Sequence, residues 1–124
     1  MRWGALETLR PAQIEAIQKR TPIAYLPWGA LEWHSLHNPV GLDGLSARAY
    51  AEALAKRTGG VVLPAVYAGT ETIKTLHPFG HTLEHKASTV RTLCREYLGQ
   101  LADCGYRVVV VVMGHVGGGH VRAI

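Results

Sequence analysis

The sequence predicts an α/β fold built as a three-layer sandwich, with a mainly parallel β-sheet covered by helices on both faces. Short apolar stretches alternate with longer amphipathic ones, in the order α-β-α-β-α-β. The apolar stretches are continuous rather than alternating, which is typical of strands buried on both faces of a parallel sheet. A chain of 124 residues has room for one such domain, over residues 1–124.

The first third of the chain predicts a helix, a strand and a long irregular segment. Residues 11–20 form the helix, because Pro11 suits a first helical position and isoleucines recur three residues apart. Residues 23–27 are a short apolar strand. The segment 28–44 is broken by Pro39 and a glycine, so we expect it to be a loop.

The middle of the chain predicts a second helix and a second strand. Ser46 is a candidate N-cap for a helix that runs to about residue 57 and ends at a Thr-Gly-Gly sequence. Residues 61–66 are apolar and predict a strand. Residues 67–86 contain several glycines and prolines, and we expect a loop there.

The last third predicts a long helix over residues 87–103 and an apolar strand over residues 106–113. A glycine-rich turn follows at residues 114–119, and His120 begins a further helix. Because the sequence stops as this helix starts, we expect an apparently truncated domain, the N-terminal portion of a longer one.

Composition restricts the class of protein. Hydrophobic residues make up 48% of the chain and charged residues 18%, which argues against intrinsic disorder. The net charge of +4 comes from scattered basic residues, so we expect no nucleic-acid partner. No apolar run is long enough for a membrane span, so we expect no membrane partner. With no apolar leader and only two cysteines, we expect a cytoplasmic protein.

Two segments carry residues that could bind a metal. Glu32, His34, His37 and Asp43 follow the strand at residues 23–27, and His115 follows the strand at residues 106–113. Parallel strands have their carboxyl ends on one edge of the sheet, so these side chains could converge. Carboxylates mixed with imidazoles suit zinc, manganese or iron(II). The alternative is a polar loop with ordinary surface residues.

Other interpretations of these histidines and glycines are weaker. The turn at residues 114–119 does not have the spacing of the G-x-G-x-x-G fingerprint of dinucleotide-binding folds. His81-Thr82-Leu83-Glu84-His85 matches the H-x-x-E-H pattern of inverted zincin peptidases. That pattern requires a helix, and the preceding proline and glycine allow one only from about His81.

The run Leu-Pro-x-Gly-x-x-Glu-x-His-x-x-His-x-Pro-x-Gly-x-Asp, from Leu26 to Asp43, resembles the creatininase (creatinine amidohydrolase) family. The Gly-His-x-Gly run at Gly114 to Gly117 and the Phe-Gly-His-Thr run at Phe79 to Thr82 resemble the same family. The resemblance covers about residues 22–119. It implies a two-metal hydrolase on an α/β sandwich with a mainly parallel sheet, assembled as a homo-oligomer, typically a hexamer.

By motif position, the resemblance implies that Glu32, Asp43 and His115 bind one divalent ion. It implies that His34 and the bridging Asp43 bind a second. A metal-activated water would then attack a cyclic amide or related carbonyl of a small-molecule substrate. His37 is not a first choice as a ligand, and we assign it either a supporting role beside the ligands or a role in proton transfer. Creatininase itself has a glutamate two residues after the histidine, where this chain has Gly117, so the second ion lacks a carboxylate other than the shared Asp43. The alternative is a non-catalytic or incomplete domain that needs a C-terminal segment or a partner.

Overall fold

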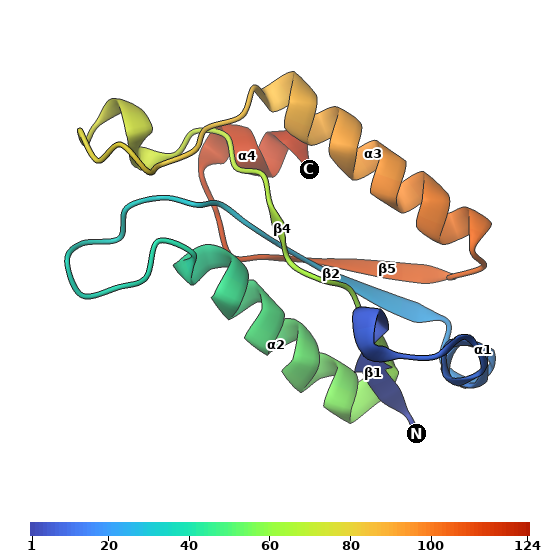
Figure 1. The fold of residues 1–124 in the computed structure, drawn as a ribbon. Helices are drawn as coiled ribbons and strands as arrows, with labels where there is room; N and C mark the ends of the chain where they lie inside the picture. The colour runs from blue at the N-terminus through green and yellow to red at the C-terminus, as the bar shows by residue number, and fades with distance from the viewer.

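A five-stranded sheet runs through the middle of the computed structural model, which describes residues 1–124, and every strand pair in this sheet is parallel (Figure 1). The strands are β1 (Trp3–Ala5), β2 (Ile23–Gly29), β3 (Gly60–Val62), β4 (Val66–Tyr67) and β5 (Val108–Met113). The longest strand, β2, is central. It pairs along its length with β5 on one side. On its other side it pairs first with β3 and then with β4.

Helices cover both faces of this sheet, as predicted. The helices are α1 (Pro11–Arg20), α2 (Leu42–Thr58), α3 (Ala87–Asp103) and α4 (Gly118–Ala123), with short 3-10 turns at Leu6–Thr8 and Ile73–Thr75. Alternate residues of β2 face opposite layers. Leu26 is buried in a cluster with side chains of α1, α3 and α4, whereas Tyr25 is buried against α2. Figure 1 shows α2 and α3 on opposite sides of β2 and β5.

The predicted helices at residues 11–20 and 87–103 are confirmed with the same bounds. In α3 the apolar spacing puts Val90, Cys94 and Leu101 into the core, which is the amphipathic pattern that located the helix. Strand β5 begins two residues later than predicted, and α4 begins two residues earlier. The three-residue strand β1 was not predicted, because so short a run carries no periodic signal.

Two predicted boundaries were wrong for identifiable reasons. The second helix begins at Leu42 rather than at a Ser46 cap, so Asp43 lies in its first turn, where a carboxylate suits the positive end of the helix. The strand predicted over residues 61–66 is divided into β3 and β4. Pro64 stands at the break, because it lacks the N–H that a ladder requires.

None of the helices is both long and apolar enough to cross a lipid bilayer.

Candidate metal centre

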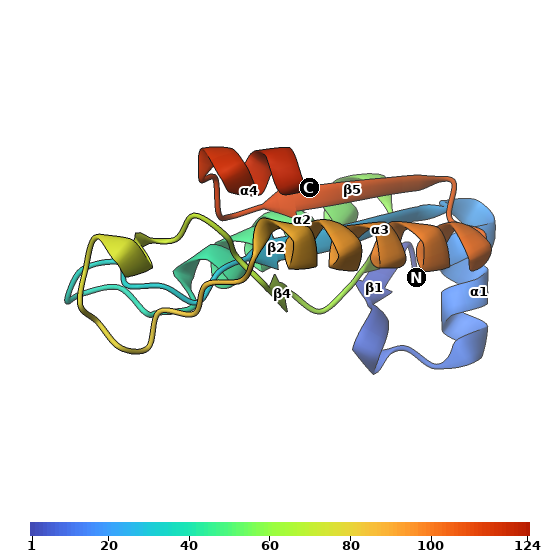
Figure 2. The same ribbon diagram turned by 90° about the horizontal axis from the view of Figure 1, so that it is seen from above.

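The candidate site lies where three parallel strands end. Beyond β2 the chain leads to Glu32 and His34, beyond β5 to His115, and beyond β4 to Thr70. The loops that follow β2 and β4 extend together past this end of the sheet (Figure 2). Carboxyl ends of parallel strands are where open α/β sheets place their sites. The two sequence segments converge as predicted because β2 and β5 are parallel and end at the same edge of the sheet.

Two glycines let the first turn of α2 lie directly on these strand ends. A side chain at Gly114, just after β5, would collide with the backbone of Asp43. A side chain at Gly29, the last residue of β2, would collide with the backbone of Gly44. This close approach carries Asp43 into the middle of the site.

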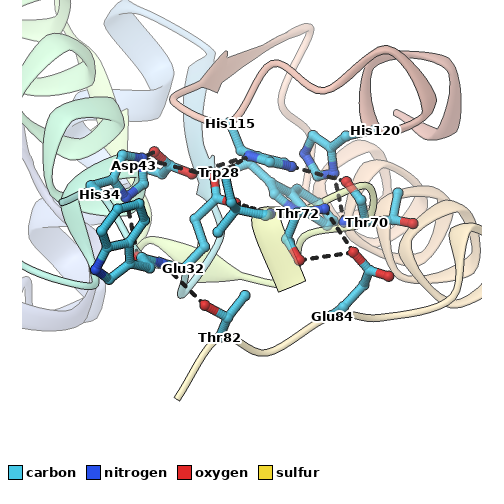
Figure 3. A network of polar contacts seen from close by, with 12 residues as sticks. Trp28, Glu32, His34, Asp43, Thr70, Thr72, Thr82, Glu84, His115 and His120 are labelled. Atoms are coloured by element: carbon cyan, nitrogen blue, oxygen red, sulfur yellow. Dashed lines mark hydrogen bonds and ion pairs between the residues drawn. The ribbon is translucent and has the colours of Figure 1, made fainter. Parts of the chain in front are cut away.

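Four of the predicted residues form one cluster, in which their side chains point toward one another (Figure 3). The two oxygens of Asp43 face different imidazoles: Oδ1 lies 2.9 Å from His34 Nε2, and Oδ2 lies 3.2 Å from His115 Nδ1. Oε1 of Glu32 lies 3.0 Å from His115 Nδ1 and 3.8 Å from His34 Nε2. The carboxylate of Asp43 therefore stands between the two histidines.

The cluster is closed to solvent except near His34. The side chains of Glu32, Asp43 and His115 are at most 10% exposed, whereas that of His34 is 23% exposed. A cavity of about 330 Å³ lies on this side, and Trp33, His34 and His77 contribute to its lining. A small molecule would thus reach the centre past His34.

One polar atom of each of these side chains is hydrogen-bonded to the main chain, which leaves the other atom available to bind a metal ion. Nε2 of His115 donates to the carbonyl of Thr70 at 2.9 Å, which leaves Nδ1 facing the carboxylates. Nδ1 of His34 donates to the carbonyl of Glu32 at 3.1 Å and leaves Nε2 free. Oε2 of Glu32 accepts from the amide of Ile73 at 2.8 Å and leaves Oε1 free. Such outer contacts fix the tautomer and orientation of metal-binding histidines.

The loop after β4 holds the loop after β2 in place. Leu31 and Leu83 form an isolated antiparallel bridge. The hydroxyl of Thr82, which is buried, accepts from the amide of Trp33 at 3.1 Å. The rings of Trp33 and His77 stack with centroids 3.7 Å apart. These contacts flank Glu32 in the sequence and directly precede His34, so they restrain the backbone that presents both side chains.

The electrostatics of the cluster reflect mutual charge compensation. Burial by itself would raise the pKa of Asp43, but the adjacent His115 and the charge of His34 outweigh it and lower that pKa. Burial would lower the pKa of His115, yet Asp43, the Thr70 carbonyl and Glu32 raise it to about 9. Without a metal the centre thus holds a proton on His115 that a bound cation would displace.

The residues fit a divalent cation. One ligand atom each from Glu32, His34 and Asp43 lie within 4.8 Å of one another. Oδ2 of Asp43 is fully buried and accepts no hydrogen bond of good geometry, which is costly for a carboxylate oxygen. His115 is not one of these three, but its Nδ1 lies 3.0 Å from Glu32 Oε1. Imidazole nitrogens mixed with carboxylate oxygens are a donor set suited to zinc or manganese.

His37 is placed apart from this cluster. It is exposed on the loop after β2, and its Nε2 lies 3.3 Å from the side-chain amide of its neighbour Asn38. No hydrogen bond or ion pair joins it to Glu32, His34 or Asp43. Its proposed proton-transfer role stays a prediction.

The peptidase interpretation of His81 to His85 was wrong in its structural requirement, because this segment is not helical. Instead, Oε2 of Glu84 accepts hydrogen bonds from the amide and the hydroxyl of Thr72, at 2.7 and 2.8 Å. The two histidines therefore do not share a helix face. The glycine-rich turn at residues 114–119 leads into α4, as expected of a strand-to-helix connection.

The sequence analysis assigned no supporting role in the site to Thr70, Ile73, Thr82 or His120. His120 is fully buried, its ring lies 4.8 Å from that of His115, and its Nδ1 accepts from the Thr70 amide at 3.4 Å. Burial and the neighbouring charge of His115 lower the pKa of His120 to about 4. Thr70 and Ile73 act through backbone atoms, which leave no side-chain signature. Their position after β4, at the same sheet edge, was the available signal.

Comparisons with known proteins identify the family and the fold of the chain. The family profile described as creatininase, creatinine amidohydrolase, matches residues 7–124. A crystal structure of creatinine amidohydrolase has 26% identity and a TM-score of 0.83, over 98% of this chain and 49% of that one. A manganese creatininase has 26% identity and a TM-score of 0.82, over 98% and 49% of the two chains.

A zinc-zinc form of a creatininase point mutant has 26% identity and a TM-score of 0.81, over 95% of this chain and 48% of that one. No curated protein matches the chain. The chain spans about half the length of the solved structures that it resembles. The match to the family profile covers nearly all of the sequence and includes each residue of the cluster. The chain belongs to the creatininase family.

Proposed function

We propose that this chain carries the metal-binding part of a metal-dependent amidohydrolase, in which Glu32, His34, Asp43 and His115 hold one or two divalent cations. The observation that carries the proposal is the position of Asp43, whose two oxygens face His34 Nε2 at 2.9 Å and His115 Nδ1 at 3.2 Å. A carboxylate placed between two imidazoles suits a bridging ligand. Zinc or manganese is favoured over iron, because the similar creatininase structures include forms with each of these metals.

Such a cation, when bound, lowers the pKa of water and polarises a carbonyl oxygen. The residues of the chain have separate tasks around it. Glu32, Asp43 and His115 supply the buried donors. His34 supplies the donor at the solvent-facing side, where a substrate would enter. His37, on the exposed loop nearby in sequence, is assigned to proton transfer with bulk water.

The proposed substrate is a small cyclic amide or related carbonyl compound. A creatininase mutant with 25% identity has been solved in complex with creatine, the ring-opened form of a cyclic amide. The 330 Å³ cavity beside His34 is of the size that a small molecule requires. We further propose that residues 1–124 belong to one α/β domain and that the active protein is a homo-oligomer.

The first test is the metal content of protein purified without chelator. We expect one or two zinc or manganese ions per chain. Asp43→Asn keeps the size of the side chain but removes its charge, so it should reduce the content to well below one ion. Asp103→Asn, at the end of α3 and far from the cluster, is the matched control and should keep the metal. Stoichiometric metal in the Asp43 variant would rule out the assignment.

A non-catalytic metal-binding domain is the second candidate. It is favoured by the span of the chain, which is about half that of the similar structures, and by the small number of donors around His34. Amide hydrolysis by the metal-loaded chain would exclude it. Metal binding without hydrolysis, together with hydrolysis once a polypeptide supplying the rest of a creatininase domain is added, would favour an incomplete enzyme instead.

A further inference from the structure

The segment after β4 contains a residue in an uncommon backbone conformation. Glu71 has a φ of 52°, in the left-handed region, and only Ser35 among the other non-glycine residues has a positive φ. A non-glycine residue there stores backbone strain, which persists when surrounding contacts require the conformation. The structural role of this conformation follows from two sets of contacts. One is made by the residues on either side of Glu71, and the other by its carboxylate.

The two flanks of Glu71 orient two members of the metal cluster. On one side, the carbonyl of Thr70 accepts from His115 Nε2 at 2.9 Å. On the other, the amide of Ile73 donates to Glu32 Oε2 at 2.8 Å. One short segment thus contacts ligands that come from the ends of two different strands, β5 and β2. The left-handed turn at Glu71 lets a carbonyl and an amide within four residues both face the cluster.

The side chain of Glu71 reaches the opposite way, to the turn that carries His115. Its Oε2 accepts a hydrogen bond from the amide of Gly119, and its Oε1 lies 3.6 Å from the Arg122 guanidinium. A side chain at Gly119 would collide with the Glu71 carboxylate. The glycine-rich turn at residues 114–119 therefore packs on Glu71, and the carboxylate caps the start of α4 from outside the helix.

We propose that Glu71 is a positioning residue for the metal centre. Its carboxylate anchors the glycine-rich turn, which carries His115, to the same segment whose backbone orients His115 and Glu32. This rests on the proposed function, because the purpose of the alignment is cation binding. Without the carboxylate, the side-chain hydrogen bonds that remain between this segment and the turn with α4 are those of the His115 and His120 rings to Thr70, so the His115 ring would be held less firmly.

Two variants separate the effect of the Glu71 carboxylate from the effect of its backbone conformation. Glu71→Gly tolerates a positive φ and removes the anchor. Glu71→Gln keeps an oxygen that accepts from Gly119 and removes the charge. Titration of the metal-free protein with Zn²⁺ should show affinity about tenfold weaker for Glu71→Gly, the lower end of what outer contacts contribute to metal sites. Glu71→Gln should restore most of the affinity. Glu15→Gln, on the exposed face of α1, is the charge-matched control.

Gly119→Ala tests the same contact from the other side. In the wild-type background the new methyl group displaces the Glu71 carboxylate, so Zn²⁺ affinity should again fall about tenfold. In the Glu71→Gly background the three atoms that the methyl group would meet first are gone, so the second substitution should have little further effect. The two substitutions are then strongly non-additive, which a general loss of stability would not produce. Additive losses would overturn the proposal.

A readout without metal separates this proposal from the proposed function. In the metal-free protein, the ¹H and ¹⁵N shifts of the His115 Nε2–H group should report its hydrogen bond to the Thr70 carbonyl in the wild type, and a weakened or exchange-broadened bond in Glu71→Gly. Unchanged ring shifts and unchanged Zn²⁺ affinity in that variant would overturn the role of Glu71. A third outcome is that the wild type binds no Zn²⁺ while the His115 ring shifts still change in Glu71→Gly. That outcome would refute the proposed function but would support the role of Glu71 in aligning His115.

Discussion

The two buried histidines of the site have opposite electrostatic environments, although their rings are neighbours. His115 faces two carboxylates, and its pKa is raised to about 9. His120 faces no carboxylate directly, and its pKa is lowered to about 4 by burial and by the charge on His115. Local geometry alone therefore decides that one ring is a cation and the other is neutral at pH 7.

This difference predicts a maximum of stability near pH 6.5 for the metal-free protein. Between pH 6.5 and 4 the unfolded chain takes up a proton on His120 that the folded protein does not, so stability falls as pH falls. Between pH 6.5 and 9 the folded protein keeps a proton on His115 that the unfolded chain has released, so stability falls as pH rises.

Urea unfolding in the presence of chelator would measure both limbs. Each imidazole changes the free energy of unfolding by at most about 1.4 kcal/mol per pH unit. His120→Gln should flatten the acid limb, and His115→Gln should flatten the alkaline limb. A wild-type profile that is flat from pH 5 to 8 would contradict the assignment of charge to these rings.

At the scale of elements, the site depends on helices that never touch it. The helices α1 and α3 cover the sheet face opposite α2, and their buried residues pack on alternate residues of β2. This packing fixes where β2 ends and, through it, where the loop with Glu32 begins. The helices were the elements that the sequence predicted best, because their apolar spacing depends only on local geometry.

Ile17→Ala tests the contribution of α1. Ile17 is 1% exposed in the main core, so its truncation should lower the free energy of unfolding by about 2–5 kcal/mol, through lost burial and the cavity left behind. Ile14→Ala removes the same atoms from a half-buried position of the same helix and should cost clearly less. Denaturant unfolding compares the two, and equal costs would contradict the placement of α1.

At the scale of the whole molecule, the centre links parts of the chain that are far apart in sequence. Glu32 and His34 come from the loop after β2, Asp43 from the first turn of α2, and His115 from the end of β5. A cation bound there would join three elements of the fold and would have no such site in the unfolded chain. Binding should therefore stabilise the fold as a whole.

The expected increase is about 2.7 kcal/mol in the free energy of unfolding when Zn²⁺ is present at a hundred times its dissociation constant. Thermal or denaturant unfolding with Zn²⁺ and with chelator measures it. Asp43→Asn should show no difference between the two conditions. An equal zinc effect in that variant would place the bound ion elsewhere on the molecule.

The sequence by itself determined the fold class, the two long helices and the residues of the cluster. Helix periodicity and continuous apolar strands are local properties, and the motif from Leu26 to Asp43 is contiguous. The early start of α2 was decided by tertiary structure, because it depends on the packing of glycines 29, 44 and 114. The division of β3 from β4 follows from Pro64, a signal that the sequence contains, while the pairing of both strands with β2 was decided in three dimensions.

The supporting contacts of the site were likewise decided only in three dimensions. Thr70 and Ile73 use backbone atoms, and Glu71 is 48 residues from Gly119, the residue that its carboxylate holds. Backbone groups carry no residue-type signal, and contacts of such separation have no period in the sequence. The sequence named the side chains that could bind a cation, whereas the parallel sheet brought them together and the segment after β4 oriented them.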